Sequence, residues 1–509
     1  MPSDPDLFAP LKRYWGYDGF RPLQERIVRS LLEGHDIAVV MPTGGGKSLC
    51  YQLPAVVMGR TVVVISPLIS LMQDQAAQLA QMGIPAAVLN SSLPPAEQNQ
   101  VIRQAIGGAF RLLYLSPERL ARQDTVEWLS RAPIAFFAID EAHCISEWGH
   151  EFRPEYRQLS ALREKFPEQP IAAFTASATQ RVRHDILAQL RLHEPHKYIA
   201  SFYRPNLRYL VRQCDGAGQL RLLLSALRAH AGENAIVYAP TVVRVGETVQ
   251  FLKQQGIRAV GYHGKMEALD RQRNQESWMS DEVRVLVGTI AFGLGINKPS
   301  VRAVVHLALP KSIEQYYQEA GRAGRDGLPA DCALLWQKRD VGLLTYFIES
   351  LKDPGEKERA WQRYHAMRRF AEASHCRHRQ ICTHFGETPK WETCSMCDVC
   401  AAVPAWMAAP SAPETRRRKQ KRATMQTSEP RRSDLADHMR EWRRTVAKGN
   451  GVPAYVILHD STLEEICRRR PASIEALLEI PGIGTRKAET YGREILSVLA
   501  AFSGPGRRA

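Results

Sequence analysis

The stretch that most constrains the fold is 41–48, with the sequence Met-Pro-Thr-Gly-Gly-Gly-Lys-Ser. It follows the apolar run 37–40 and precedes a helical pattern that begins at Leu49. A strand, a glycine-rich turn and a helix start in this order place backbone N–H groups around a polyphosphate. The strict spacing of this motif has glycine where Met41 stands, but three consecutive glycines and the preceding strand compensate. The sequence therefore predicts a nucleoside triphosphate site formed by Thr43, Gly44, Gly45, Gly46, Lys47 as counter-charge and Ser48 as a magnesium ligand.

The length and the apolar content bound the class of protein. At 509 residues the chain is too long for one core and predicts about three to four domains. No apolar stretch reaches the ~18 residues that span a bilayer, and the acidic start lacks the basic and apolar parts of a signal peptide. We therefore expect a cytoplasmic protein without a membrane partner.

The positive charge is concentrated at the C-terminal end. Residues 401–509 carry 20 Lys and Arg against 12 Asp and Glu, which gives +8 of the total net charge of +15. This distribution favours a polyanionic partner for that region. A basic surface that only aids solubility is the alternative.

Apolar runs alternate with helical patterns in the first 200 residues. The runs are 61–66, 111–116, 135–140 and 171–175. They predict strands buried on both faces of a parallel sheet, whose ligands bind at the carboxyl ends of the strands. Asp140 and Glu141 lie at such an end, where one carboxylate can hold Mg²⁺ and the other can polarise the attacking water. An ordinary acidic pair at a strand end is the alternative.

The same alternation resumes in the second part of the chain. The later runs are 234–238, 258–263, 283–288, 301–306 and 331–336. They predict a second parallel sheet, but no second Gly-Lys-Ser turn accompanies it, so one nucleotide should lie between two similar domains. Arg322 and Arg325, three residues apart, share a helical face and can neutralise charge on the γ-phosphate. Arginines in a surface turn are the alternative.

The segment 140–156 carries the most specific resemblance. Its sequence Asp-Glu-Ala-His-Cys-Ile-Ser-Glu-Trp-Gly-His-Glu-Phe-Arg-Pro-Glu-Tyr resembles the Walker B box and the aromatic-rich loop of RecQ-family DNA helicases, in helicase superfamily two. Aromatic and basic residues that follow catalytic carboxylates can stack on bases and report strand occupancy to the ATP site. We expect Trp148, Phe152 and Arg153 to contact DNA. Packing of the two aromatic rings into the core is the alternative.

Other nucleotide-site motifs resemble those of the same family. Tyr17, Arg21 and Gln24 resemble the adenine-reading motif of helicases, because a glutamine amide can pair with N6 and N7 of adenine. The segment 175–179 resembles the motif that links the ATP and DNA sites, with Ser177 where threonine is common.

Further DNA contacts are expected at the ends of strands. The segment 288–299 resembles the motif that contacts both the DNA backbone and the nucleotide, and it contains Asn297. Ser66 and Arg119, each after a strand, are placed to hold phosphates without reading sequence.

The resemblance also implies roles in catalysis. It makes Arg325 the arginine finger and Arg322 a γ-phosphate contact or sensor. One feature departs from the family: the Cys-x-Ser-Arg-like turn after the second half's first strand is replaced by Tyr-Ala-Pro-Thr at 238–241, and the arginine is displaced. The predicted catalytic set is Lys47, Asp140, Glu141, His143, Gln318, Arg322 and Arg325.

Five of the ten cysteines lie between Cys376 and Cys400, which in a cytosolic protein favours a metal over disulfides. Cys394, Cys397 and Cys400 offer three thiolates in one loop, and Cys376, in a helical stretch over 361–385, offers the fourth that tetrahedral zinc needs. The spacing also resembles the RecQ zinc-binding region. Cys382 is an alternative fourth ligand, and an iron–sulfur cluster is an alternative metal group.

The residues after the cysteines divide into a linker and a tail domain. Residues 403–432 contain several prolines and the basic run 416–422, so they predict a flexible linker without a core. The family usually places a winged-helix domain here, and the segment is too short for one. Residues 433–503 resemble the HRDC domain of RecQ and ribonuclease D proteins. Their Pro-Gly-Ile-Gly turn at 481–484 exposes N–H groups for a phosphate or for helix capping alone.

The predicted fold is therefore α/β with a helical tail. Two RecA-like parallel-sheet motor domains occupy 1–200 and 201–340, and a small helical zinc-binding region occupies 341–402. The linker is followed by the all-α HRDC-like bundle.

The resemblance implies an ATP-dependent DNA helicase with ATP, Mg²⁺ and Zn²⁺, moving 3′ to 5′ on single-stranded DNA and unwinding duplexes in repair or recombination. Two alternatives stay open: a DNA-dependent ATPase that translocates or anneals with weak strand separation, and a non-motor DNA-binding scaffold. RNA is a further candidate substrate. Single-strand-binding or repair proteins are candidate partners. A monomer is compatible with the sequence, which does not define the oligomeric state, the preferred DNA structure or the pathway.

Overall fold

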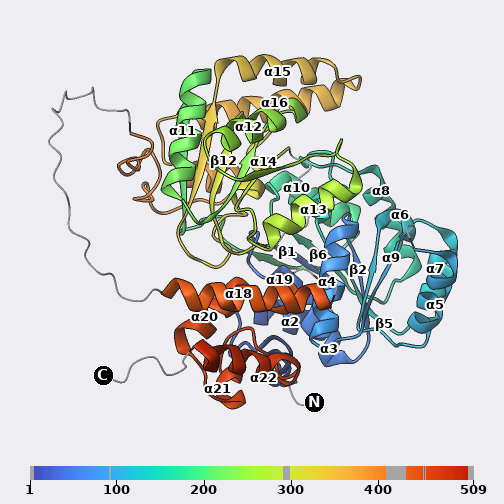
Figure 1. The fold of residues 1–509 in the computed structure, drawn as a ribbon. Coiled ribbons are helices and arrows are strands. Elements are labelled where there is room, and N and C mark those ends of the chain that lie inside the picture. The colour runs from blue at the N-terminus through green and yellow to red at the C-terminus, as the bar shows by residue number, and fades with distance from the viewer. Residues whose placement is uncertain are drawn as a thin grey trace, which may run out of the picture.

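The computed structural model describes residues 5–90, 93–289, 298–408, 432–450, 452 and 454–502. They form two lobes, each built on a parallel sheet, a small region that follows the second lobe, and a C-terminal helical bundle (Figure 1). The bundle packs against the N-terminal elements of the first lobe, so segments from opposite ends of the chain lie side by side.

The first lobe contains a seven-stranded sheet in which every neighbouring pair of strands is parallel. Successive residues point to opposite faces, so Val63 and Ile65 enter one core while Val62 and Val64 enter the other. The strands, in sheet order, are β3 (Ala86–Leu89), β4 (Leu112–Leu115), β2 (Thr61–Ile65), β5 (Ile134–Ile139), β6 (Ile171–Thr175), β1 (Ile37–Val40) and β7 (His196–Ile199).

Helices cover both faces of this sheet. They are α1 (Phe8–Pro10), η1 (Leu11–Trp15), α2 (Gln24–Leu32), α3 (Lys47–Met58), α4 (Ile69–Gln81), α5 (Pro95–Ile106), α6 (Pro117–Leu120), α7 (Gln123–Leu129), η2 (Ala142–Ile145), α8 (Pro154–Arg157), η3 (Gln158–Ala161), α9 (Leu162–Lys165) and α10 (Gln180–Gln189).

The second lobe repeats the architecture with a six-stranded parallel sheet. Its strands, in sheet order, are β10 (Ala259–Tyr262), β11 (Val285–Gly288), β9 (Asn234–Tyr238), β12 (Val301–His306), β13 (Ala330–Trp336) and β8 (Leu207–Gln213). The helices that accompany it are α11 (Gly216–Ala229), α12 (Val242–Gln254), α13 (Ala268–Met279), α14 (Ile313–Ala320), α15 (Lys338–Glu349) and α16 (Pro354–Glu372).

Aromatic side chains join the second lobe to the region that follows it. The rings of Phe202 and Phe385 stack with centroids 4.2 Å apart, and Tyr317 packs against both. Phe385 ends α17 (Arg377–His384). These residues belong to one continuous core that extends into the first lobe, so both lobes and this region share buried apolar surface.

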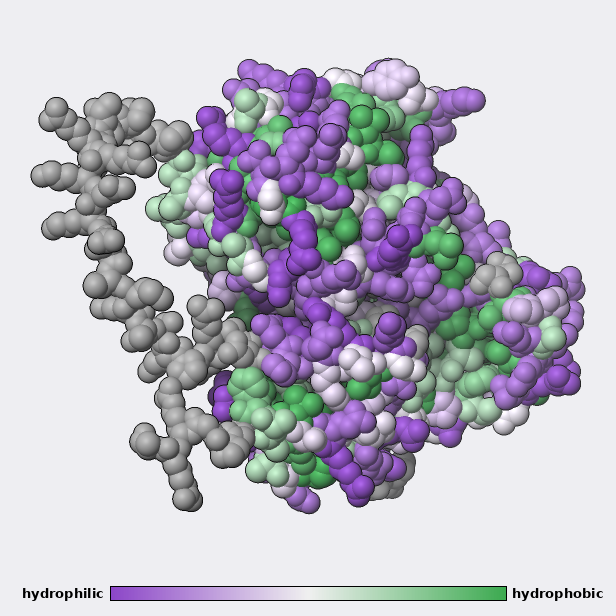
Figure 2. Space-filling view, in the orientation of Figure 1, coloured by the Kyte–Doolittle hydropathy of each residue, from purple (hydrophilic) through white to green (hydrophobic). Residues whose placement is uncertain are grey.

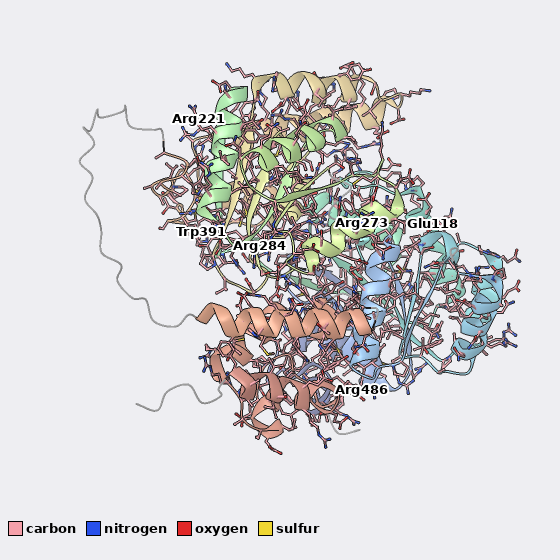
Figure 3. All side chains as sticks on the ribbon, in the orientation of Figure 1. Glu118, Arg221, Arg273, Arg284, Trp391 and Arg486 are labelled. Atoms are coloured by element: carbon pink, nitrogen blue, oxygen red, sulfur yellow. The ribbon has the colours of Figure 1, made fainter. Side chains whose placement is uncertain are left out.

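The tail bundle has a core of its own. It consists of α18 (Arg432–Gly449), α19 (Ala454–Ile457), α20 (Asp460–Arg469), α21 (Ile474–Leu478) and α22 (Thr485–Phe502). In Figure 3, Arg486 lies on α22 where the bundle meets the first lobe, and its side chain packs beside Gly83 at the end of α4.

Two predictions about local structure were wrong. The stretch 361–385 is not one helix, because α16 ends at Glu372 and Cys376 caps the start of α17. Residues 403–408 do not belong to a flexible linker: Met407 is buried on the second lobe, and the Trp406 indole donates to Asp331 at 3.1 Å. These apolar side chains give the segment a packing site that its prolines and charge did not indicate. Residues 409–431, with the basic run, lie outside the described residues.

The surface is mixed. On the face in Figure 2, hydrophilic residues predominate over both lobes and apolar residues show in smaller patches between them. Among the described residues, no helix combines the length and the apolar character needed to cross a bilayer.

Candidate active site

The glycine loop connects β1 to α3, as the sequence predicted. Gly44 and Gly46 have φ angles of 82° and 83°, a left-handed conformation that glycine adopts without strain. This backbone lets α3 begin at Lys47, whose Nζ donates to the carbonyl oxygen of Met41 at 3.2 Å. The side chain of Lys47 and the N-terminus of α3 therefore line the same cavity.

The predicted adenine-reading residues fold onto this loop. Gln24 is 2% exposed; its Oε1 accepts from the backbone N–H of Arg21 at 2.8 Å, and its Nε2 donates to the Gly46 carbonyl at 3.2 Å. The Arg21 guanidinium donates to the Gly44 carbonyl. Tyr17 lies at the edge of the same cavity. Hydrogen bonds thus join the segment predicted to read the base to the loop predicted to bind the phosphates.

The acidic pair lies at the carboxyl end of β5, next to the glycine loop. Asp140 is 6% exposed, and Glu141 has a φ angle of 47°, which is uncommon for a residue with a side chain. His143 Nδ1 lies 3.2 Å from Glu141 Oε2 and 3.0 Å from the Thr175 hydroxyl at the end of β6. His143 therefore orients Glu141 and connects it to the segment 175–179.

The two neighbouring carboxyl groups have opposite pKa shifts. Burial and the adjacent Glu141 raise the pKa of Asp140 to about 7, although Lys47 opposes the shift. Burial also acts to raise the pKa of Glu141, but the hydrogen bond and charge of His143 outweigh it and lower the pKa to about 2. Glu141 is thus ionised at neutral pH and able to polarise water, while a cation bound beside Asp140 would stabilise the carboxylate form of that side chain.

The second lobe places arginines against the glycine loop. A Cβ atom built on Gly44 would lie 3.3 Å from Cγ of Arg325, so the arginine packs directly on the loop. Arg322 is 9% exposed and lines the same cavity. Burial and the neighbouring charges of Arg322 and Arg204 lower the pKa of Arg325 to about 9. This clustering of positive charge is what a polyphosphate would neutralise.

A hydrogen bond joins the two lobes beside these arginines. Gln318 on α14 donates from Nε2 to the Ser177 hydroxyl at 2.9 Å. Ser177 belongs to the segment that also contacts His143 through Thr175. The sequence-predicted residues Gln318, His143 and Glu141 therefore form one chain of contacts across the cleft.

These groups surround one cavity of about 620 Å³. Its walls include the glycine loop, both carboxylates, the arginines of the second lobe and seven residues of the tail bundle. The tail residues are Tyr455, His459, Ser461, Thr462, Pro481, Gly482 and Lys487.

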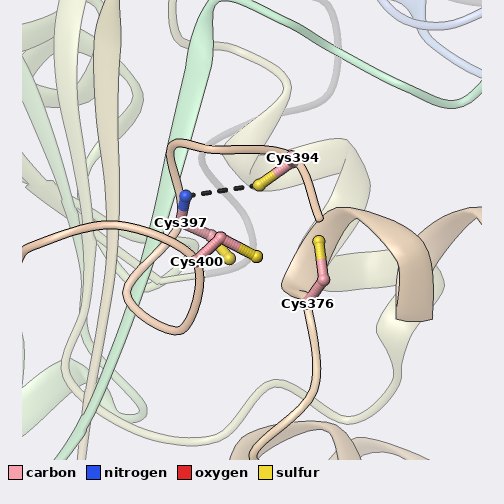
Figure 4. Close-up of side chains that lie close together, drawn as sticks. All are labelled: Cys376, Cys394, Cys397 and Cys400. Carbon is pink, nitrogen blue, oxygen red and sulfur yellow. Dashed lines mark hydrogen bonds between the residues drawn. The ribbon is translucent and has the colours of Figure 1, made fainter. Parts of the chain in front are cut away.

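Four cysteine thiols form a compact group after the second lobe (Figure 4). The sulfur atoms of Cys376, Cys394, Cys397 and Cys400 all lie within 4.8 Å of one another. The backbone N–H of Cys397 donates to Cys394 Sγ at 3.3 Å, and that of Arg377 donates to Cys397 Sγ at 3.5 Å. This donor set fits a tetrahedral zinc ion with four thiolate ligands. Cys382, the alternative fourth ligand, is buried and is not in the group.

The aromatic-rich loop lies between basic side chains rather than free in solvent. The Arg181 guanidinium carbon is 3.0 Å from the Trp148 ring centroid, and Arg359 of α16 approaches the same ring at 5.4 Å. Phe152 is half-buried under Arg157. Arg153 donates to the Pro67 carbonyl at 3.4 Å. Trp148 thus packs at the core's edge and also connects the first lobe to α16.

The other predicted DNA contacts are less accessible. Ser66 and Arg119 are 2% and 5% exposed, and Arg119 pairs with Asp124 at 3.5 Å. Their role as phosphate contacts stays a prediction. Asn297 lies outside the described residues.

Four segments of the chain match models of known families. Residues 21–186 match the DEAD/DEAH box helicase family and residues 218–327 match the helicase conserved C-terminal domain. Residues 338–401 match the RecQ zinc-binding family and residues 432–499 match the HRDC domain. Only residues 402–431 separate the last two matches, which leaves no room for a winged-helix domain between them.

A relative that is matched over nearly its whole length decides the family. An ATP-dependent DNA helicase RecQ of Bacillus subtilis is 31% identical over 586 residues, covering 97% of this chain and 98% of the relative. The chain belongs to the RecQ family. A RecQ helicase of Haemophilus influenzae is 43% identical over 400 residues, covering 79% of this chain and 64% of the relative. The chain thus spans less than two thirds of the length of the Haemophilus relative and of one from Pasteurella multocida, where the share is 62%.

Solved structures agree on the fold. The match to a leucine-to-valine variant of S. cerevisiae Dbp5 bound to RNA and ADP BeF3 has a TM-score of 0.54 at 17% identity, covering 68% of this chain and 91% of that one. A DUF1998 helicase, MrfA, bound to DNA and AMPPNP matches with a TM-score of 0.55 at 20% identity, covering 69% and 53%. These likenesses, at 17% and 20% identity, concern the fold of the RecQ chain.

Sequence reasoning missed two parts of this RecQ site. Arg204 donates from Nη1 to the Thr43 carbonyl at 3.0 Å and from Nη2 to the Gly324 carbonyl at 3.2 Å. It therefore bridges the glycine loop and the segment that carries Arg322 and Arg325. The signal was an arginine at the start of the second lobe, in Phe-Tyr-Arg-Pro-Asn at 202–206. No sequence pattern indicated that the tail bundle would form a wall of the cavity, because this wall depends on packing between segments that are distant in the sequence.

Proposed function

We propose that this RecQ chain is an ATP-dependent DNA helicase that hydrolyses ATP between its two lobes and uses the resulting motion to move along single-stranded DNA. The single observation that carries the proposal is the meeting of Arg325 with Gly44 across the cleft that also holds Lys47 and the acidic pair. A triphosphate site completed by an arginine from a second RecA-like lobe is the arrangement that couples hydrolysis to lobe movement.

Each side chain has a defined task in this proposal. Lys47 and the loop N–H groups bind the β- and γ-phosphates, and Glu141, ionised and held by His143, orients and activates the attacking water. Ser48 and Asp140 would hold Mg²⁺, which neutralises phosphate charge when bound. Arg325 stabilises the charge that develops on the γ-phosphate, and Arg322 adds positive charge beside it.

DNA binding and polarity form the second part of the proposal. The chain of contacts from Glu141 through His143 and Thr175 reaches Ser177 and Gln318, so a change at the phosphates is felt in both lobes. Trp148 touches Arg181 of the first lobe and Arg359 of α16, which places it to respond to a strand bound between them. By likeness to the family we propose 3′ to 5′ movement. Roles in repair, protein partners and a cytoplasmic location stay predictions from the sequence.

Zinc at the four-cysteine group is proposed as a structural element. Asp398, in the same loop, forms a salt bridge with Arg377 at 3.0 Å. Its backbone N–H also donates a hydrogen bond to the Tyr209 carbonyl of β8 at 3.0 Å. The loop is thereby fixed to the second lobe. We expect one zinc per chain by metal analysis, loss of that zinc in Cys376→Ser and retention in Cys382→Ser. Equal zinc content in the two variants would contradict the ligand assignment.

The central test uses Lys47→Ala in the full chain. ATP hydrolysis stimulated by single-stranded DNA should fall by about a thousandfold, because the phosphate counter-charge is lost. Lys338→Ala, on the outside of α15, is the matched control and should hydrolyse ATP normally. Unchanged hydrolysis in Lys47→Ala would refute the motor proposal and favour a DNA-binding scaffold.

The short segment between the zinc region and the tail favours one alternative, an ATPase that translocates but separates strands weakly. A duplex-unwinding assay with and without ATP distinguishes the two. Efficient unwinding by the purified chain removes this alternative, and DNA-stimulated hydrolysis without unwinding supports it. Comparing stimulation by single-stranded DNA, duplex DNA and RNA identifies the preferred strand.

A further inference from the structure

The tail bundle docks on the first lobe by direct backbone contact. A Cβ atom on Gly484 would lie 2.6 Å from the carbonyl oxygens of both Arg13 and Tyr14, and a Cβ on Gly16 would lie 2.5 Å from the Ile483 carbonyl. Only glycine fits at both positions, so the backbone of the turn 481–484 and the backbone at the end of η1 are in direct contact. The Tyr491 hydroxyl adds a hydrogen bond to Gln81 on α4 at 2.5 Å.

The same bundle is fixed to the second lobe by buried charges. Arg443 of α18 pairs with Asp460 at 2.8 Å and approaches Asp281 of the second lobe at 3.9 Å. Lys298 pairs with Asp281 at 2.7 Å, and the Ser300 hydroxyl donates to Asp460 at 2.9 Å. Because the bundle contacts both lobes, it spans the opening of the nucleotide cleft.

Two nitrogen groups of the bundle line the cavity and have no partner among the residues that the structure describes. Lys487 is 4% exposed, and its ammonium forms no hydrogen bond or ion pair with the described residues. Burial lowers the pKa of Lys487 to about 8, so it is still mostly charged at pH 7. His459 beside it has a buried Nδ1 without a hydrogen-bond partner. A buried, unpaired ammonium is costly unless a ligand supplies the missing charge.

We propose that the tail bundle forms the third wall of the nucleotide site and that Lys487 binds an anionic oxygen of the nucleotide held by the two lobes. This inference rests on the proposed function, since it takes the cavity ligand to be ATP. Lys487 is then a ligand-binding residue contributed by the tail, and His459 is positioned to supply a second polar contact. Docking of the tail and binding of the nucleotide stabilise each other by linkage.

The test measures binding of Mg²⁺ and the non-hydrolysable analogue AMP-PNP to the full chain by calorimetry. Lys487→Met keeps an unbranched side chain one atom shorter than lysine and removes its charge. We expect its Kd to rise by about tenfold, the effect of losing one charge-assisted hydrogen bond. Arg493→Met, on the exposed face of the same helix, is the matched control and should bind as the wild type does.

A second variant separates ligand contact from docking. Gly484→Val collides with the Arg13 and Tyr14 carbonyls and should release the tail, seen as a larger radius of gyration in small-angle X-ray scattering. Its Kd should rise by about the same tenfold factor, and adding Lys487→Met should cause no further loss. Lys487→Met alone should keep the wild-type scattering curve.

The outcomes are distinguishable from failure of the motor proposal. If the wild type binds AMP-PNP and hydrolyses ATP while Lys487→Met binds equally well, this inference is wrong and the proposed function stands. An equal loss in Arg493→Met also overturns it, because the effect would then be one of overall charge. If the wild type does not bind the nucleotide, both proposals fail.

Discussion

The two lobes share one architecture and differ in what they bring to the cleft. The first lobe supplies a glycine loop after β1 and a carboxylate pair after β5, whereas the second supplies Arg322 and Arg325 after α14. In the proposed mechanism neither set hydrolyses a triphosphate alone, since one holds the phosphates and the other stabilises the charge that develops on them. A parallel sheet therefore provides positions at its strand ends, and the residues at those positions determine the chemistry.

The largest expected effect comes from removing the second lobe's contribution. Arg325→Ala should lower DNA-stimulated ATP hydrolysis by about a thousandfold, because the γ-phosphate loses its arginine, while AMP-PNP affinity changes much less. Rapid-quench hydrolysis and calorimetry measure the two quantities. Arg221→Ala, on α11 away from the cleft in Figure 3, is the control. Normal hydrolysis by Arg325→Ala would show that the second lobe is not catalytic.

A change in the first lobe should separate binding from chemistry in the same way. Glu141→Gln keeps the shape of the side chain but cannot activate water, so hydrolysis should fall by about a hundredfold with AMP-PNP binding retained. Glu118→Gln, exposed after β4, which β2 separates from β5 in the sheet, tests whether any strand-end carboxylate matters. An equal loss in both variants would remove the specific role of Glu141.

The smallest effect concerns the stability of the first lobe. The pKa of Asp140 is raised because the folded protein prefers the protonated carboxyl group. The contribution of this group to the free energy of folding is therefore fully present below about pH 4 and is lost as the pH rises through about 7. Without added magnesium, Asp140→Asn should raise Tm by on the order of 5 °C at pH 8 and by little at pH 5. Thermal unfolding at both pH values measures this, with Asp270→Asn as control. A larger gain at pH 5 would contradict the assigned shift.

The sequence predicted most of both sheets and missed their less apolar strands. The central strands are continuous apolar runs because both faces are buried, and these were identified. β3, β7 and β8 were not predicted. They lie at sheet edges, and β7 buries only Tyr198 among its four residues, so no apolar run indicates it.

The candidate site was predicted where motifs are local and missed where distant segments meet. The glycine loop and the pair Asp140–Glu141 are each contiguous, so their chemistry can be read from spacing alone. The tail wall depends on Gly16 meeting Ile483, two positions at opposite ends of the chain. No local pattern encodes such a contact, because its glycines look like ordinary turn residues in the sequence.

The position of Arg204 has a consequence for how a reaction cycle would proceed. Its guanidinium donates to the carbonyls of Thr43, Ala323 and Gly324, and its backbone leads directly into β8. A shift of the glycine loop relative to the second lobe would therefore strain the bond to Thr43 or displace the polypeptide that joins the two lobes. In the proposed cycle, departure of the spent phosphate and separation of the lobes are therefore coupled, and Arg204 at the crossover is one of the side chains that carry this coupling.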